Sequence, residues 1–325
     1  MRWVRYRPSH QTGAEQLGVL VGDEVRGAGP GDLLDLIGSS GLERAGLRAL
    51  ASPTEVRPLE DVVLLAPVER PPSIRDFMSF EQHVEGMGRL VGARPHVPDV
   101  WYQQPLFYFS NPASVIGPGD DVPIPPGCDV FDFELEVAAV VGPVSGIDDL
   151  ADLTLDESAR AVAGYLLMND WSARDLQSVE MQGPLGPCKG KDSSTTLGPW
   201  FLTADELPDL ASGGPTGVNL SVTVNDVLFG ESSVDSMGWS FAEMVAYASR
   251  GTRLRTGDVL GSGTCGDGCL AERWGRRGRD SVAPLRPDDV VTLSGGPLGS
   301  TANRVVTGSP IRQALDRRPV SGAHR

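Results

Sequence analysis

The 325-residue chain lacks a long apolar run and is poor in cysteine. No stretch of about 18 apolar residues occurs, so no membrane-spanning helix is predicted. The start, MRWVRYRPSH, lacks the apolar segment of a signal peptide. Because the four cysteines are scattered and form no disulfide framework, we expect a cytoplasmic protein in a reducing compartment. These cysteines are Cys128, Cys188, Cys265 and Cys269.

The chain also has too little positive charge for a polyanionic partner. It carries 28 Lys and Arg against 43 Asp and Glu, which gives a formal net charge of -15. Binding to nucleic acid or to an anionic membrane surface requires clustered basic side chains, so we expect neither as a partner. The hydrophobic content of 40% is ordinary for a globular protein, and the length allows one large domain with a small accessory one.

A run of alternating acidic and apolar residues, FDFELEVAAVVG, begins at Phe131. A period of two places Asp132, Glu134 and Glu136 on one face of a strand. If that face is buried, its like charges need a counter-charge, which a bound cation would supply. The solvated face of an edge strand explains the pattern equally well, so both interpretations stay open at this point. Asp132 has no assigned role.

A proline-rich joint, APVERPPS, divides the chain into a small module and a larger domain. Residues 1–68 read as strands around one predicted helix at residues 31–50, which indicates a β-rich module. Residues 69–325 alternate strand patterns, turns and short helices. The whole pattern predicts an α+β protein that is mainly β.

The segment from Ile74 to Gly92 contains a candidate pair of functional side chains. Its apolar spacing predicts a helix over at least part of its length. In a continuous helix, Asp76 and His83 are two turns apart on one face and could contribute to one site. The alternative is an Asp that caps the helix and a His on its surface.

A second helix is predicted over residues 171–181, directly after a strand that ends at Asp170. The spacing places Arg174 and Gln177 near that aspartate. Asp170 and Arg174 could equally be an ordinary surface ion pair. A glycine-rich loop surrounds Lys191, but it lacks the glycine and the Ser or Thr of a phosphate-binding loop, so we reject nucleotide binding there.

Five separated motifs resemble those of the fumarylacetoacetate hydrolase (FAH) family. They occur in the family's order between residues 74 and 306, which is nearly everything except the N-terminal module. The resemblance implies a mixed β-roll or barrel-like catalytic domain and a homodimer. The motifs are RDFMSFEQHV, FDFELEVAAVVG, MNDWSARDLQ, GPCKGKDSSTTLGPW and SGTCGDGC.

The resemblance also implies a site for a divalent cation. Matching motif to motif assigns Glu134, Glu136 and Asp170 as ligands, and Asp76 as a fourth ligand that some members use. An all-oxygen donor set suits Mg²⁺ first, with Mn²⁺ and Ca²⁺ as alternatives, and argues against zinc or copper.

The catalytic residues are implied in the same way. His83 resembles the general base that activates water, and Glu272 resembles its carboxylate partner. Three further side chains resemble groups that hold the carbonyl under attack and the charge that develops on it. They are Arg174, Gln177 and Lys191.

Two more features bear on the substrate. Gly263 and Thr264 resemble backbone contacts beside the substrate carboxylate, and Tyr108 resembles a substrate contact. Met78 and Met181 stand where the founding hydrolase has tyrosines, which makes the pocket more apolar. We therefore expect an acylpyruvate, or a ring-fission product of aromatic breakdown, in preference to fumarylacetoacetate itself.

The function implied is that of a metal-dependent hydrolase that cleaves a carbon–carbon bond in a 2-oxo acid or 1,3-diketone. Water activated by His83 would attack the carbonyl, and the metal would stabilise the enolate that is released. A decarboxylase, hydratase or isomerase on the same metal site is the alternative among enzymes. A binding or scaffold protein that has kept the fold and lost the chemistry is the alternative from another class.

Overall fold

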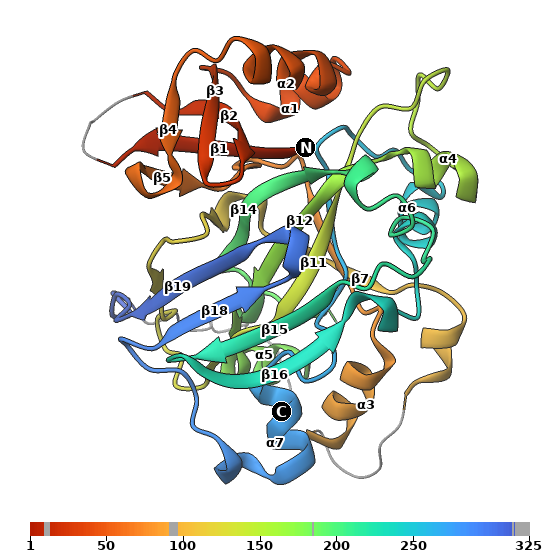
Figure 1. Cartoon of the computed structure of the whole chain (residues 1–325). Coiled ribbons are helices and arrows are strands. Elements are labelled where there is room, and N and C mark those ends of the chain that lie inside the picture. The colour runs from red at the N-terminus through yellow and green to blue at the C-terminus, as the bar shows by residue number, and fades with distance from the viewer. Residues whose placement is uncertain (10–13, 91–96, 184, 314, 316–325) are drawn as a thin grey trace.

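The computed structural model describes residues 1–9, 14–90, 97–183, 185–313 and 315. Most of its regular structure is strand, and the helices are short, so the predicted α+β, mainly β class is confirmed (Figure 1). Within the described ranges, none of the helices has both the length and the apolar character needed to cross a membrane.

The secondary structure follows the chain in three groups. Before residue 66 lie β1 (Arg2–Pro8), β2 (Gln16–Val21), β3 (Glu24–Gly29), α1 (Leu33–Gly38), α2 (Leu42–Ala51), β4 (Val56–Pro58) and β5 (Val62–Leu65). Next come β6 (Ile74–Phe77), α3 (Glu81–Leu90), β7 (Phe107–Ser110), β8 (Val115–Ile116), β9 (Val122–Pro123), β10 (Phe131–Asp132), β11 (Leu135–Val141), α4 (Leu155–Arg160), β12 (Val162–Asp170), β13 (Ser172–Ala173) and α5 (Arg174–Glu180). The last group is β14 (Thr195–Thr203), β15 (Asn219–Val224), β16 (Val227–Ser233), α6 (Phe241–Ser249), β17 (Val259–Gly261), α7 (Leu270–Arg277), β18 (Val290–Ser294) and β19 (Ser300–Val306).

The N-terminal strands form as predicted, but the single helix predicted over residues 31–50 is two helices. The hydroxyl of Ser39 donates to the carbonyl of Asp35 at 2.7 Å, and Ser40 adopts a φ of 52°. A left-handed residue cannot continue an α-helix, so α1 ends there and α2 begins at Leu42. Both helices lie over the N-terminal strands in Figure 1.

Twelve strands of the described residues form one sheet, in the order β4-β3-β2-β1-β14-β12-β11-β17-β6-β7, with β5 beside β1 and β8 beside β14. This order is an open path, so the described strands do not close into a barrel. β1 joins β14 with Trp3 opposite Phe201, and the N-terminal strands thus continue the sheet of the rest of the chain. The division into residues 1–68 and 69–325 stays a prediction from the sequence.

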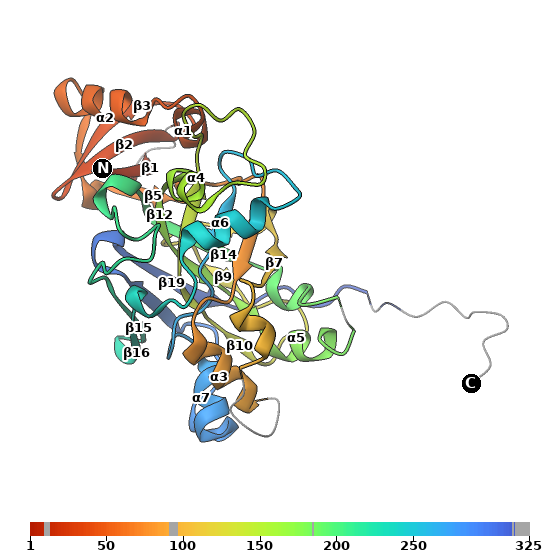
Figure 2. The same ribbon diagram turned by 90° about the vertical axis from the view of Figure 1, so that its right-hand side faces the viewer.

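A second sheet covers one face of the large sheet. Its five strands have the order β16-β15-β18-β19-β9, and the main core lies between it and strands β11 and β12. Figures 1 and 2 both show the N-terminal elements at one end of the molecule and α3 with α7 at the other.

Strand β11 has a core on each face, which explains its uninterrupted apolar sequence. Val137 and Ala139 belong to the main core, whereas Ala138 and Val140 belong to a second core shared with the N-terminal elements. Both sets are buried because side chains alternate between the faces of a strand. Glu136 therefore lies in a strand whose two faces are both removed from water.

Two local predictions are confirmed. The hairpin of β15 and β16 turns at Asn225 and Asp226, whose φ angles of 52° and 63° suit the two-residue turn that matches strand twist. The side chain of Thr154 and that of Glu157 form the predicted capping box at the start of α4.

Two helix predictions are confirmed over part of their length, by α3 and by α5. Asp76 lies on β6 and His83 on α3, so no continuous helix joins them, because residues 74–77 pair with both β17 and β7. The part of that predicted helix beyond Leu90 lies outside the described residues. Residues 171–173 are likewise not helical, and Arg174 is the first residue of α5.

A buried ion pair holds β6 against β17. The Arg75 guanidinium lies 3.2 Å from Asp258 Oδ2, and both side chains are buried. Asp258 also accepts a hydrogen bond from the Ser73 hydroxyl at 2.8 Å and one from the Arg255 backbone N–H at 2.8 Å. The parallel pairing that results places Asp76 opposite Gly261.

We expect Asp258→Ala to lower the free energy of unfolding by about 3–5 kcal/mol, because it leaves a buried guanidinium without its counter-charge. Urea unfolding followed by circular dichroism measures this loss. Asp149→Ala is the matched control, since Asp149 pairs with Arg253 at the surface and such pairs contribute little. Equal effects of the two substitutions would contradict the prediction.

Candidate active site

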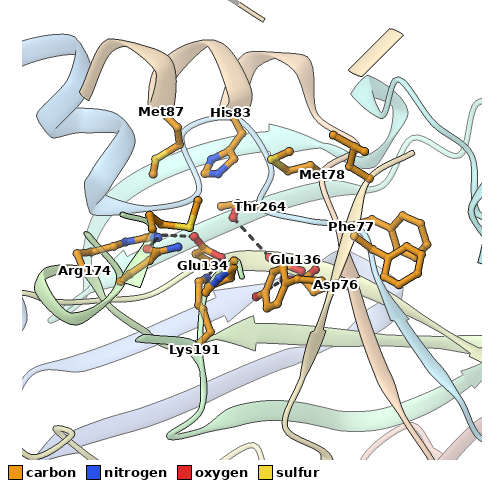
Figure 3. A pocket seen from close by; sticks show the side chains of 17 residues that line it. Asp76, Phe77, Met78, His83, Met87, Glu134, Glu136, Arg174, Lys191 and Thr264 are labelled. Atoms are coloured by element: carbon orange, nitrogen blue, oxygen red, sulfur yellow. Dashed lines mark hydrogen bonds and ion pairs between the residues drawn. The ribbon is translucent and has the colours of Figure 1, made fainter. Parts of the chain in front are cut away.

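A cavity of about 350 Å³ lies where β6, β7 and β11 meet helices α3 and α5 (Figure 3). Acidic and basic side chains line one part of it, and apolar side chains line the other. Its lining residues are Asp76, Phe77, Met78, His83, Met87, Leu106, Phe107, Tyr108, Glu134, Glu136, Arg174, Gln177, Met181, Gly186, Pro187, Lys191 and Thr264.

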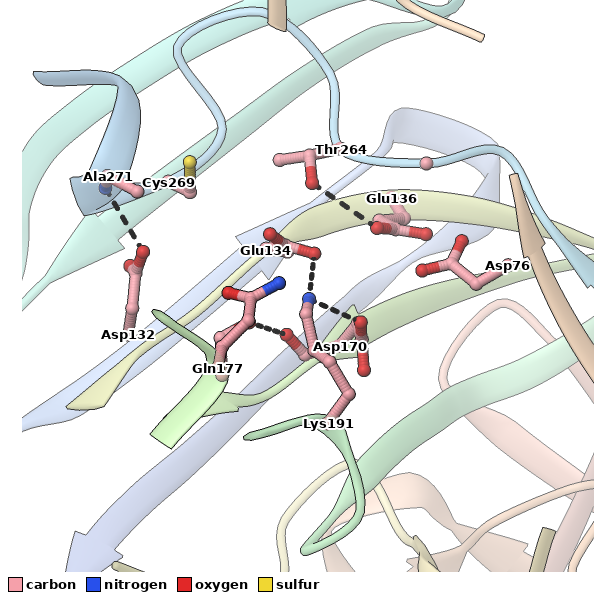
Figure 4. A network of polar contacts seen from close by, with 12 residues as sticks. Asp76, Asp132, Glu134, Glu136, Asp170, Gln177, Lys191, Thr264, Cys269 and Ala271 are labelled. Carbon is pink, nitrogen blue, oxygen red and sulfur yellow. Dashed lines mark hydrogen bonds and ion pairs between the residues drawn. The ribbon is translucent and has the colours of Figure 1, made fainter. Parts of the chain in front are cut away.

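Four carboxylates meet at the polar part of the cavity. Each offers an oxygen within 4.8 Å of one from every other member, and all four side chains are buried. They come from β6, the residue before β11, β11 itself and the end of β12 (Figure 4). The structure thus brings together all the metal ligands predicted from the sequence, namely Asp76, Glu134, Glu136 and Asp170.

Two basic side chains offset part of this charge. Lys191 Nζ lies 2.5 Å from Glu134 Oε2 and 2.5 Å from Asp170 Oδ2. Arg174 Nη2 lies 2.6 Å from Glu134 Oε1. Burial alone would raise the pKa of Glu134, but Lys191 and Arg174 outweigh it and hold that pKa well below its usual range. Glu134 is therefore ionised in the metal-free site.

The other three carboxylates each keep one oxygen without a hydrogen-bond partner among the described residues. These buried atoms are Asp76 Oδ1, Glu136 Oε2 and Asp170 Oδ1. Burial, reinforced by the neighbouring carboxylates, raises the pKa of Glu136 well above its ordinary value and that of Asp76 to about 8. Such an arrangement is costly unless a positive charge joins it.

The donor set fits a hard divalent cation. Ligands on opposite sides of an octahedral Mg²⁺ are about 4.2 Å apart, and those around Ca²⁺ about 4.8 Å, given their usual bond lengths. The oxygens of the cluster lie within 4.8 Å of one another, which is close to these spans. Because all four donors are carboxylates, the site suits Mg²⁺, Mn²⁺ or Ca²⁺ better than zinc or copper.

Gly261 leaves the space between the carboxylates open. It pairs with Asp76 across β17 and β6. A Cβ atom at this position would lie 2.5 Å from Asp76 Oδ1 and 3.0 Å from Glu136 Oε2, two of the oxygens that lack a partner. Any side chain there would occupy the space in which those two oxygens can share a ligand.

His83 and Glu272 form a second buried group beside the carboxylates. His83 Nδ1 lies 2.7 Å from Glu272 Oε1, and Glu272 is fully buried. Glu272 Oε2 accepts a hydrogen bond from the Asp267 backbone N–H at 3.0 Å and forms an ion pair with Arg276 Nη2 at 2.9 Å. A carboxylate accepts hydrogen bonds, so His83 Nδ1 donates to Glu272, and in a neutral imidazole Nε2 is the nitrogen left to accept a proton.

Helix packing explains why this pair meets across 189 residues of sequence. Helices α3 and α7 lie against each other, and a Cβ atom at Gly86 would be only 2.9 Å from Glu272 Cγ. The glycine thus lets α7 approach α3 closely enough for Glu272 to reach the imidazole. Sequence spacing alone could not indicate that contact.

Asp132, to which the sequence analysis assigned no role, positions residues around the site. Its carboxylate accepts hydrogen bonds from the backbone N–H groups of Leu270 and Ala271, at 2.8 and 3.0 Å, at the start of α7. It also accepts from Arg174 Nε at 2.8 Å. One buried carboxylate therefore fixes both the helix that carries Glu272 and the guanidinium that holds Glu134.

Sequence reasoning missed two further neighbours of the histidine. Cys269 caps α7 and has its Sγ 3.9 Å from His83 Nδ1. Arg276 lies four residues after Glu272 on the same helix, and that spacing is a signal that could have revealed the pair.

The remaining predicted residues take different positions. Gln177 and Thr264 line the cavity, and the Thr264 hydroxyl donates to Glu136 Oε1 at 3.4 Å. The Tyr108 hydroxyl donates to Asp76 Oδ2 at 2.9 Å. Gly263 is not among the described lining residues; its φ is 79°, and a Cβ there would lie 2.3 Å from the Phe77 carbonyl. Because Gly263 has no side chain, its backbone can lie close to β6.

Fold and site together bring a cluster of four buried carboxylates and a histidine–carboxylate pair to one cavity. The family profile described as fumarylacetoacetate (FAA) hydrolase C-terminal matches residues 73–306. The chain belongs to the FAH family.

Its curated relatives include fumarylacetoacetases. That of Arabidopsis thaliana is 30% identical over an alignment of 242 residues; the match covers 61% of this chain and 57% of the relative. That of Homo sapiens is 29% identical over an alignment of 229 residues; the match covers 58% of this chain and 54% of the relative. This chain thus spans little more than half the length of either relative.

Solved structures share the fold over 95% of this chain and the whole of theirs. One is a probable 2-hydroxyhepta-2,4-diene-1,7-dioate isomerase from Mycobacterium abscessus, with a TM-score of 0.70 and 25% identity. Another is maleylpyruvate hydrolase from Sphingobium sp. SYK-6, in complex with manganese(II) and pyruvate, with a TM-score of 0.69 and 23% identity.

We expect Gly261→Ala to fold but to lose cation binding, because its methyl group fills the space between Asp76 and Glu136. Calorimetric melting with and without Mg²⁺ or Mn²⁺ measures this: the cation should raise the melting temperature of the natural protein and leave that of the variant unchanged. Gly119→Ala, at a glycine whose Cβ would meet nothing within 4 Å, is the control. If the cation raised the melting temperature of Gly261→Ala as much as that of the natural protein, the carboxylate cluster would be ruled out as the cation site.

Proposed function

We propose that the protein is a cation-dependent hydrolase that cleaves a carbon–carbon bond in a 2-oxo acid or 1,3-dicarbonyl compound. The observation that carries the proposal is the His83–Glu272 pair, which opens into the same cavity as the carboxylate cluster. The fumarylacetoacetases among its relatives and the maleylpyruvate hydrolase of the same fold support it. The homodimer and the cytoplasmic location stay predictions from the sequence.

The proposal takes Mg²⁺ as the cation, with Mn²⁺ and Ca²⁺ as the alternatives, because an all-oxygen donor set suits hard cations. Asp76, Glu134, Glu136 and Asp170 would hold it. When bound, the cation supplies a Lewis acid that stabilises negative charge on the substrate oxygens.

His83 Nε2 would take a proton from a water molecule as that water attacks the more distant carbonyl of the substrate. Glu272, ionised and buried, orients the ring and stabilises the imidazolium that forms. The new C–O bond forms and the C–C bond breaks, and its electron pair leaves with the 2-oxo acid fragment as an enolate. The proton held by His83 can then return to that carbon.

Gln177 and Lys191 are placed to stabilise the oxygen of the carbonyl under attack. Gln177 Oε1 accepts a hydrogen bond from Arg174 Nη1 at 3.0 Å, so the Gln177 amide nitrogen is the atom left to donate to substrate. Lys191 Nζ has two carboxylate partners and keeps one N–H for the same purpose. Donors held in place before the reaction are the effective ones, and each can contribute about 3 kcal/mol to lowering the barrier.

We expect His83→Ala to reduce kcat by about 10²–10⁴-fold, the usual contribution of a general base. The rate is measured from the loss of the ultraviolet absorption band of the diketone. The rise in melting temperature that the cation causes should be the same in His83→Ala as in the natural protein. Gln82→Ala, an exposed neighbour on the same helix, is the control and should retain activity. A His83→Ala enzyme as fast as the natural protein would refute the role of the base.

The reaction class is tested by identifying the products formed from a panel of acylpyruvates. Hydrolysis yields two acids, one of them pyruvate. The M. abscessus isomerase makes isomerisation the second candidate, since a base beside a cation can also move a proton within an intact molecule. Conversion of every substrate without loss of its carbon skeleton would overturn the hydrolase and favour the isomerase.

A further inference from the structure

The cavity has an apolar part that the proposed chemistry does not use. Met78, Met87, Leu106, Phe107 and Met181 line it. Figure 3 shows Met78 and Met87 beside His83, on the side of the cavity away from Lys191. Whatever substrate group extends past the attacked carbonyl meets these side chains.

Among the described residues, this apolar part holds no counter-charge for an anion. Among the described residues that line the cavity, only Arg174 and Lys191 carry a fixed positive charge. Arg174 is already paired with Asp132 and Glu134, and Lys191 with Glu134 and Asp170. A second substrate carboxylate placed among the methionines would lose its water and gain no cationic partner, which is costly.

Met87 is the lining residue best placed to contact the group beside the attacked carbonyl. It lies four residues after His83 on α3, and residues at that spacing share one face of a helix. It is half-buried and packs against the main core, whereas Met78 and Met181 are 37% and 57% exposed. A thioether side chain without branches adapts to apolar groups of different length.

An aromatic part of this lining is held in place by ring packing. The ring of Phe107 packs against that of Phe77 at a centroid distance of 5.0 Å and against that of Phe109 at 5.5 Å. An apolar chain in contact with this ring and with the flexible methionines is held by burial alone, without hydrogen bonds.

We propose that the apolar part of the cavity binds an alkyl acyl group, and that Met87 is a specificity-determining residue for it. The preferred substrates are then acylpyruvates with a single carboxylate and an unbranched alkyl tail, and those with a second carboxylate are disfavoured. This inference rests on the proposed function.

The first experiment compares kcat/KM for hexanoylpyruvate and maleylpyruvate, with Mg²⁺ present. We expect kcat/KM for hexanoylpyruvate to exceed that for maleylpyruvate by about 100-fold. Burying the unpaired second carboxylate of maleylpyruvate costs more free energy than the loss of apolar contacts from a shorter tail would. Met87→Lys should reduce this ratio by about 10-fold or more, and Met87→Leu, which stays apolar, should keep it. Thermal melting of both variants checks that each is folded.

Calorimetric binding of two unreactive probes separates this inference from the proposed function. We expect 2-oxooctanoate to bind more tightly than 2-oxoadipate, and Met87→Lys to narrow the difference. If no acylpyruvate is cleaved, the proposed function fails, and the probe affinities still decide the inference. Cleavage of maleylpyruvate as fast as hexanoylpyruvate, or equal affinity for the two probes, would overturn the inference and leave the hydrolase standing.

Discussion

The concentration of four carboxylates in a space removed from water is the constraint on which the rest of the structure depends. Such a cluster is unfavourable by itself, and Lys191 and Arg174 offset only part of it. Three buried oxygens remain without a partner in the described residues. A site built in this way has an affinity for a positive ion before any substrate arrives, because the ion relieves repulsion that the fold has already imposed.

The fold sustains this cluster through contacts behind it. The large sheet brings three of the carboxylates together on β6, β11 and β12, and the ion pair of Arg75 with Asp258 holds β6 in place. Gly261 keeps the space between two of them open. Asp132 fixes Arg174 on one side and the start of α7 on the other. The carboxylate cluster and the His83–Glu272 pair are thus linked through one buried carboxylate.

The cavity divides its work between chemistry and selection. Its polar part is built from the motifs that place the chain in the FAH family, and its apolar part comes from α3, β7 and the segments beside them. Both basic groups of the polar part pair with buried carboxylates, and Lys191 keeps one N–H beyond these pairs. Under the proposed function, this arrangement of charge would also limit which substrates the apolar part accepts.

The sequence by itself determined the strand class, the hairpin turn at Asn225, the capping box and, through the family motifs, the side chains of the site. These depend on local periodicity, on turn chemistry or on residue identity, all of which can be read within a short window. Only the tertiary structure decided that Asp76 lies on a strand, that Asp132 serves α7, and how α3 and α7 pack so that His83 reaches Glu272. Each of these depends on pairing or packing between segments distant in the chain, where long-range contacts override local propensity.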